Sequence, residues 1–199
     1  MTKPATRIQK KNRTAILAAG LEVFSQFGFR GATLDQIADA AGLSKPNLLY
    51  YFPSKEEIHK QLLTSLLSAW LDPLRKMDDA GDPIEEILGY AKRKLDLSRD
   101  YPRESRLFAN EVLQGAPHLG DTMPALKTLI DEKAKVINGW AKAGKIAAID
   151  PHHLMFLIWA QTQHYADFDA QVRAVLGRDD PFPEAFAFME HMLRRTLAP

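Results

Sequence analysis

Polar and aromatic side chains are interleaved with apolar ones over residues 45–52, which read Lys-Pro-Asn-Leu-Leu-Tyr-Tyr-Phe. Leu48, Leu49 and Phe52 can pack into a core, which leaves the lysine, the asparagine and the two tyrosines for an outside partner. Lys and Asn can hydrogen-bond to base edges, and a tyrosine hydroxyl can donate to a phosphate. The candidate nucleic-acid contacts are therefore Lys45, Asn47, Tyr50 and Tyr51.

The elements that must position these residues are two short helices on either side of an Ala-Gly-Leu-Ser turn at 41–44. The glycine permits a sharp turn, and Ser44 can cap the second helix, so the pattern predicts a helix-turn-helix. Thr33 and Lys55 stand at expected helix starts, where backbone N–H groups favour phosphate. Short helical hairpins that bind no nucleic acid share this pattern, so the turn alone does not decide the function.

A second group with usable chemistry is Trp159 and Gln163, which share one helix face because they are four residues apart. An indole can stack on a flat ring, and a carboxamide carries both a donor and an acceptor. Gln163 lies in an otherwise apolar helix, so it needs a partner: a ligand, another side chain or a second copy of the chain. Trp70 and Phe108 are the next pocket candidates, with plain core packing as the alternative.

Residues for catalysis or metal binding are not evident. His152 and His153 are adjacent, so they point apart on a helix and chelate poorly. The sequence contains no Ser/His/Asp arrangement and no glycine-rich phosphate loop. We therefore expect a protein that is not an enzyme and that has no cofactor and no metal site.

Composition narrows the class of protein. The 199 residues are 46% hydrophobic and 26% charged, as in ordinary globular proteins, and the absence of cysteine fits a reducing compartment. No signal peptide or membrane-spanning run is evident, so a cytoplasmic protein with no membrane partner is expected. Residues 1–55 carry eight Lys or Arg against three Asp or Glu, although the whole chain has a net charge of only +1. A basic N-terminal segment is typical of a contact with a polyanion, or of a solvated tail.

Helical periodicity runs through almost the whole chain, and no strand pattern is sustained. The fold class predicted is all-α, with a three-helix head and a body of about six helices. The expected helices cover about 8–27, 33–41, 45–52, 54–77, 83–99, 103–114, 122–143, 151–175 and 182–197. Pro73 should kink or end the fourth of them.

Residues 24–44, followed by Tyr-Phe-Pro-Ser-Lys-Glu at 51–56, resemble the TetR family of repressors. The resemblance implies a homodimer whose two heads enter successive major grooves of double-stranded operator DNA. It also implies that the last two long helices form the dimer interface. Leu49 stands where the family usually has a tyrosine, so the tyrosine contacts are expected to shift to Tyr50 and Tyr51.

Segments elsewhere, among them Ser-Arg-Asp-Tyr-Pro at 98–102 and Trp-Ala-Gln-Thr-Gln-His-Tyr at 159–165, resemble members of this family that regulate pyrimidine utilisation. That resemblance implies uracil, or thymine, as the small-molecule effector. The alternatives are a TetR-type sensor of another compound, such as a purine, an amide or a lipophilic molecule, and a DNA-binding protein without any effector.

The resulting prediction is a DNA-binding domain at residues 1–54 and a ligand-binding and dimerisation domain at 55–199. The dimer would hold its heads at operator spacing, and the effector would favour a body shape that moves them away. The long helix from Ser54 to about Met77 is expected to transmit this change from the body to the DNA-binding head.

Overall fold

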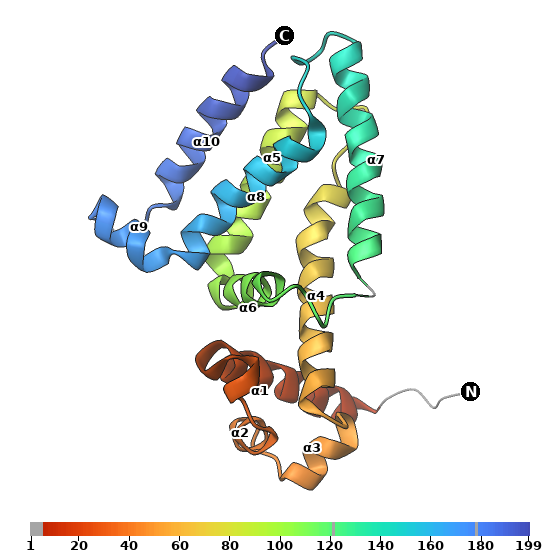
Figure 1. Ribbon diagram of the computed structural model, residues 1–199, viewed down its shortest axis with the longest axis vertical. Coiled ribbons are helices and arrows are strands. Elements are labelled where there is room, and N and C mark those ends of the chain that lie inside the picture. The colour runs from red at the N-terminus through yellow and green to blue at the C-terminus, as the bar shows by residue number, and fades with distance from the viewer. Residues whose placement is uncertain (1–5, 121, 178) are drawn as a thin grey trace. The chain divides into compact units, whose positions relative to one another are not determined.

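The computed structural model describes residues 6–120, 122–177 and 179–199, which form ten helices and contain no strand (Figure 1). These helices group into two compact units. The first unit comprises Met1–Leu66 and Arg106–Gly120, and the second comprises Leu67–Ser105 and Asp121–Pro199. This division reflects how the helices pack. The boundary at residue 54 between a DNA-binding domain and a ligand-binding domain stays a prediction.

The first unit contains three complete helices and parts of two others. They are α1 (Arg7–Gly31), α2 (Leu34–Ala40), α3 (Lys45–Tyr51), the first part of α4 (Lys55–Arg75) and the later part of α6 (Pro102–Leu113). Their shared core is fully enclosed, because Ile16, Ile37, Leu48, Phe52 and Ile58 are each 0% exposed. The helix-turn-helix is thus fixed by apolar burial on the inner sides of its two helices.

Local sequence signals explain where these helices start and stop. Thr33 caps α2 in a reciprocal capping box with Gln36, and the Ser44 hydroxyl accepts a hydrogen bond from the Asn47 backbone N–H. Gly42 takes a left-handed conformation, with φ of 66°, in the turn between α2 and α3. The predicted positions of both short helices are confirmed.

The second unit contains α5 (Pro83–Asp100), α7 (Met123–Lys142), α8 (Pro151–Asp167), α9 (Asp169–Leu176), α10 (Phe182–Leu197) and the remaining turns of α4 and α6. Figure 1 shows α5, α8 and α10 side by side, with α7 against α8. Their core includes Tyr90, Ile137, Ile158, Leu193 and Leu197. Aspartates cap α5 and α8, and each is followed by a proline in the first turn.

Three sequence-based boundaries differ from the structure. The first helix, expected at about 8–27, extends to Gly31 with non-helical dihedral angles at Gly28. The helix expected at 151–175 divides at Phe168, whose φ of −116° and ψ of 31° are not helical. No glycine or proline marks this break, so the residues from α4 onward form seven helices among those described instead of about six. The helix expected to reach about Met77 ends at Arg75, two residues after Pro73.

None of the helices formed by residues 6–120, 122–177 and 179–199 combines the length and the hydrophobicity needed to cross a membrane.

Candidate DNA-binding and effector-binding sites

The α3 helix presents a polar outer face, as its sequence predicts. Leu48 and Phe52 are fully buried and lie four residues apart, whereas Asn47 is exposed and Tyr50 is 71% exposed. The expectation that Leu49 also packs inward is wrong, because its side chain is 38% exposed. A helix of seven residues has one narrow inner face, and Leu48 with Phe52 already fills it.

The two tyrosine hydroxyls are held by amides of α1. Asn12 Nδ2 donates to Tyr51 Oη at 2.9 Å, and Gln9 Nε2 donates to Tyr50 Oη at 3.4 Å. The two rings contact each other edge to face, with centroids 5.0 Å apart. Because each hydroxyl accepts a bond from α1, its own proton is directed elsewhere and can be donated to a phosphate.

The α3 backbone is anchored by Arg13, whose guanidinium donates to the Tyr51 carbonyl at 3.0 Å and to Gln61 Oε1 at 2.6 Å. The same guanidinium lies 4.2 Å from the centroid of the Phe52 ring. These contacts fix α3 to α1 and α4 within the first unit.

The two candidate lysines are in different environments. Lys45 pairs with Asp35 at 2.9 Å, and both side chains are largely solvent-exposed, so the pair opens at little cost. The Lys55 ammonium instead donates to the Phe29 and Ala32 carbonyls, at 2.9 and 3.0 Å, beside the end of α1. A phosphate contact at Lys55 would therefore use the backbone N–H at the start of α4. The Thr33 backbone N–H instead donates to Gln36 Oε1 at 2.8 Å, within the capping box of α2.

Trp159 lies on α8 and is partly buried. Its indole Nε1 donates to the hydroxyl of the buried Tyr90 at 2.7 Å. Its ring also lines a pocket of about 350 Å³ between α7 and α8, together with Met123, Leu126, Lys127, Ile130, Asp131, His152 and Phe156. Burial raises the pKa of Tyr90, so this hydroxyl stays neutral over the physiological range and can bond to a further polar group.

The other three effector candidates are placed separately. Gln163 is partly buried one helical turn beyond Trp159, and it does not line the pocket between α7 and α8. Trp70 is 6% exposed and belongs to the second unit, whereas Phe108 belongs to the first. The structure thus groups Trp159 with residues of α7, and the roles of Gln163, Trp70 and Phe108 in binding stay predictions.

Lys94 is a polar residue of this region that the sequence reasoning missed. It is only 7% exposed, and its ammonium lies 5.0 Å from the centroid of the Trp70 ring. Burial lowers the pKa of Lys94 to about 8, against the opposing charge of Asp167. The available signal was a lysine within the apolar face of α5, four residues after Tyr90.

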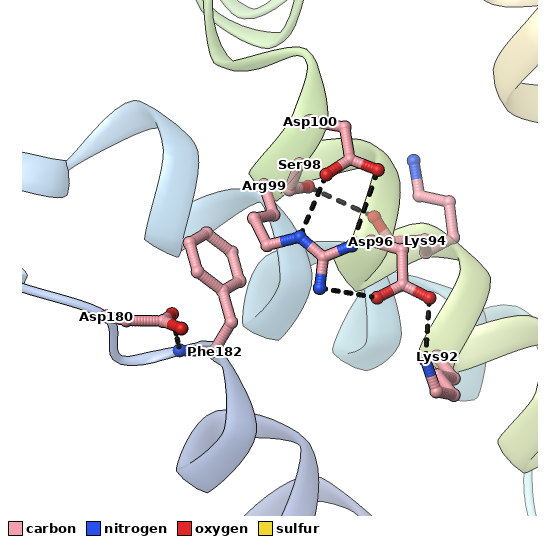
Figure 2. A network of polar contacts seen from close by, with 8 residues as sticks. All are labelled: Lys92, Lys94, Asp96, Ser98, Arg99, Asp100, Asp180 and Phe182. Carbon is pink, nitrogen blue, oxygen red and sulfur yellow. Dashed lines mark hydrogen bonds and ion pairs between the residues drawn. The ribbon is translucent and has the colours of Figure 1, made fainter.

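Figure 2 shows how Lys94 differs from the charged residues near it. Lys92 and Arg99 are paired with carboxylates, at 2.7 Å to Asp96 and 2.8 Å to Asp100. The Ser98 hydroxyl bonds to the Lys94 carbonyl at 3.2 Å, and no dashed line reaches the Lys94 ammonium from the other residues drawn. The surface lysine Lys92 thus pairs with a carboxylate, and the buried Lys94 lies against the ring of Trp70.

An apolar surface extends over α8 and α10. Phe156, Phe188 and Met192 are 51%, 60% and 41% exposed. A pocket of about 280 Å³ within this surface is lined by Leu95, Ala160, Gln161, His164, Tyr165, Ala185, Phe188 and Met189. So many exposed large side chains on two adjacent helices are typical of a protein interface.

Comparison with known proteins decides the class. Residues 16–62 match the family described as "Bacterial regulatory proteins, tetR family", and residues 63–199 match "YcdC-like protein, C-terminal region". The chain belongs to the TetR family. It is therefore a DNA-binding transcriptional regulator and not an enzyme.

Individual relatives agree with the family. The regulator RutR of Escherichia coli K12 is 52% identical over 185 residues, which cover 91% of this chain and 87% of RutR. The repressor NicS of Pseudomonas putida is 27% identical and covers 72% of this chain and 68% of its own length. Among solved structures, the regulator KstR2 of Mycobacterium tuberculosis gives a TM-score of 0.75 with 18% identity, over 99% of this chain and 97% of that one. The TetR fold is thus confirmed.

Proposed function

We propose that this TetR-family regulator represses transcription as a homodimer on operator DNA, and that a pyrimidine such as uracil or thymine releases it. The main support for this proposal is the 52% identity with RutR over 91% of the chain. The resemblance of several segments to regulators of pyrimidine utilisation agrees with it. The exposed apolar surface of α8 and α10 supports the dimer.

The proposed DNA contacts lie on and around the helix-turn-helix. Asn47 and Lys45 would read base edges, while the tyrosine hydroxyls and the helix N-termini would bind phosphates. The full set comprises Thr33, Ser44, Lys45, Asn47, Tyr50, Tyr51 and Lys55. Its support is the exposure of the α3 outer face and the fixed tyrosine hydroxyls.

The proposed effector contacts begin with Trp159, which would stack on the pyrimidine ring, and Gln163, which would pair with its imide edge. Trp70 would supply a second aromatic wall. The Lys94 ammonium lies 5.0 Å from the centroid of the Trp70 ring and would donate to a ring carbonyl of the pyrimidine. Phe108 is proposed from the sequence alone.

Isothermal titration calorimetry tests this assignment with uracil, thymine and a purine. We expect saturable heat with uracil that disappears in Gln163→Ala and persists in Gln171→Ala, a matched change at an exposed glutamine of α9. Heat with the purine alone would replace the pyrimidine by another effector class. Silence with all three ligands would overturn the pyrimidine assignment and leave the DNA-binding function intact.

The dimer is tested separately by light scattering after size-exclusion chromatography. Phe188→Glu places a charge in the exposed apolar surface and is expected to give monomers, because an unpaired buried charge disfavours association. Glu57→Lys, a charge change on the exposed side of α4, is the control. A Phe188→Glu protein that remains dimeric would exclude this surface as the interface.

A further inference from the structure

Three potential metal-ligating side chains converge within the first unit. His59 lies on α4, Glu111 on α6 and His118 in the loop that follows α6. His59 Nε2 is 3.1 Å from Glu111 Oε2, and His118 Nδ1 is 3.2 Å from the same oxygen. One ligand atom from each of the three residues lies within 4.8 Å of the other two.

These distances resemble those of a zinc coordination sphere. Tetrahedral Zn²⁺ with ligands at about 2.0–2.1 Å holds neighbouring donor atoms roughly 3.3–3.5 Å apart. Two of the three donor separations already have nearly this length, so only the separation between the imidazoles must shorten. His118 can move for this purpose because it lies in a loop and its side chain is 21% exposed.

The cluster is enclosed in a way that presents its ligands ready to bind. His59 is 2% exposed and Glu111 is 5% exposed. The Phe29 ring contacts both imidazoles, with centroids 4.8 Å from His59 and 4.7 Å from His118. The Phe24 ring packs edge to face on His59 at 4.9 Å. Packed rings fix imidazole orientation and exclude water from one side, while the exposed edge of His118 leaves space for a water ligand.

The donor set also suits a cation. Two imidazoles and one carboxylate form a set of ligands that Zn²⁺ prefers. The Glu111 carboxylate is positioned by the His118 backbone N–H, which donates to Oε1 at 2.6 Å and leaves Oε2 to face both imidazoles.

We propose that His59, Glu111 and His118 bind a divalent transition-metal ion, with Zn²⁺ as the best fit. The ion would link α4 to the loop after α6 within the first unit, and it would stabilise that unit by joining segments distant in sequence. This proposal reverses the expectation of no metal site. No motif indicated one because His59 and Glu111 are separated by 52 positions in the chain.

The test uses untagged full-length protein that has been dialysed against a chelator and then titrated with Co²⁺. Tetrahedral Co²⁺ has strong visible absorption, so the spectrum reports both binding and geometry. We expect saturable tetrahedral absorption that Zn²⁺ displaces. Glu111→Gln and His118→Ala should each weaken binding by at least about tenfold, because each removes a ligand. His191→Ala, which changes an exposed histidine of α10, is the matched control.

Thermal unfolding with and without Zn²⁺ provides a second measurement, and circular dichroism at low temperature verifies that each variant is folded. Zn²⁺ should raise the melting temperature of the wild type and of His191→Ala, but not of His118→Ala. Absence of saturable Co²⁺ binding, or equal binding by His118→Ala, would overturn the proposal. The cluster would then be a hydrogen-bond network only.

Discussion

The helix-turn-helix and the α5–α8 region differ in how their polar groups are placed. The candidate DNA contacts are carried by one short continuous segment, and their side chains face outward with their hydroxyls held by α1. The polar groups around Trp159 come from separate helices and are buried, as the bond from Trp159 to Tyr90 illustrates. The candidate DNA contacts therefore need only a short segment with an exposed face. The candidate effector contacts need several helices, distant in sequence, to pack together.

The largest effect on stability is expected from removing a buried side chain that holds the helix-turn-helix in place. Phe52→Ala deletes a fully buried ring beneath Arg13 and should lower the free energy of unfolding by about 3–5 kcal/mol. Denaturant titration at fixed protein concentration, followed by circular dichroism, measures the loss. Operator binding should fall with it, while uracil binding persists at low temperature. A loss below about 1 kcal/mol would mean that the inner face of α3 contributes little.

The buried Lys94 should make the stability of the α5–α8 region depend on pH. The folded-state pKa of Lys94 is about 8, below its ordinary value of 10.5, so the unfolded chain binds more protons between these values. The stability contributed by this group therefore rises with pH, by about 2 kcal/mol from pH 8 to pH 10.

Melting temperatures of the wild type and of Lys94→Met over this pH range test that linkage. Methionine has nearly the same volume as lysine and no titratable amine. We therefore expect Lys94→Met to be more stable than the wild type at pH 7, and the difference in melting temperature to shrink as the pH rises. A constant difference across the range would show that Lys94 is not the titrating group. Lys92→Met is the control, since that lysine is exposed and paired with Asp96.

The DNA contacts should separate into base readers and phosphate binders. Asn47→Ala should weaken operator binding by about 1–3 kcal/mol and leave the salt dependence unchanged, because asparagine is uncharged. Lys45→Ala should reduce the slope of log affinity against log salt by about 1 if its ammonium binds a phosphate. Fluorescence anisotropy at several salt concentrations measures both. Equal losses on operator and random DNA in Asn47→Ala would remove it from the base readers.

The smallest effect concerns the exposed pair of Lys45 and Asp35. Asp35→Asn should change the free energy of unfolding by less than about 1 kcal/mol, because the pair is solvated. The same change frees Lys45 and should slightly strengthen DNA binding. A larger loss of stability would show that the ion pair holds α2 to α3.

The all-helical fold and the positions of the helices in the helix-turn-helix could be predicted from the sequence, because the residues that specify them lie close together in the chain. Thr33, Ser44 and Gly42 specify the two short helices and their turn within a dozen residues. The break at Phe168 was missed, since no local signal marks it. Lys94 was missed because its burial depends on tertiary packing, with α8 against α5 and the Trp70 ring beside the ammonium.

The family resemblance supplied what periodicity could not, namely the class of protein and a candidate effector. It could not supply the environment of Lys55, whose ammonium is bonded to carbonyls of the α1 region. Nor could it indicate the cluster of His59, Glu111 and His118, whose members come from distant segments. Both depend on tertiary contacts of this chain.

Release of operator DNA by the effector is the property that most directly distinguishes a pyrimidine-responsive repressor. Operator DNA selected by the protein from a random library would be labelled and bound by the wild type, and fluorescence anisotropy would be followed during titration with uracil. We expect the anisotropy to fall to the value of free DNA for the wild type and for Gln171→Ala, and to stay high for Gln163→Ala. Unchanged anisotropy of the wild-type complex at saturating uracil would contradict it.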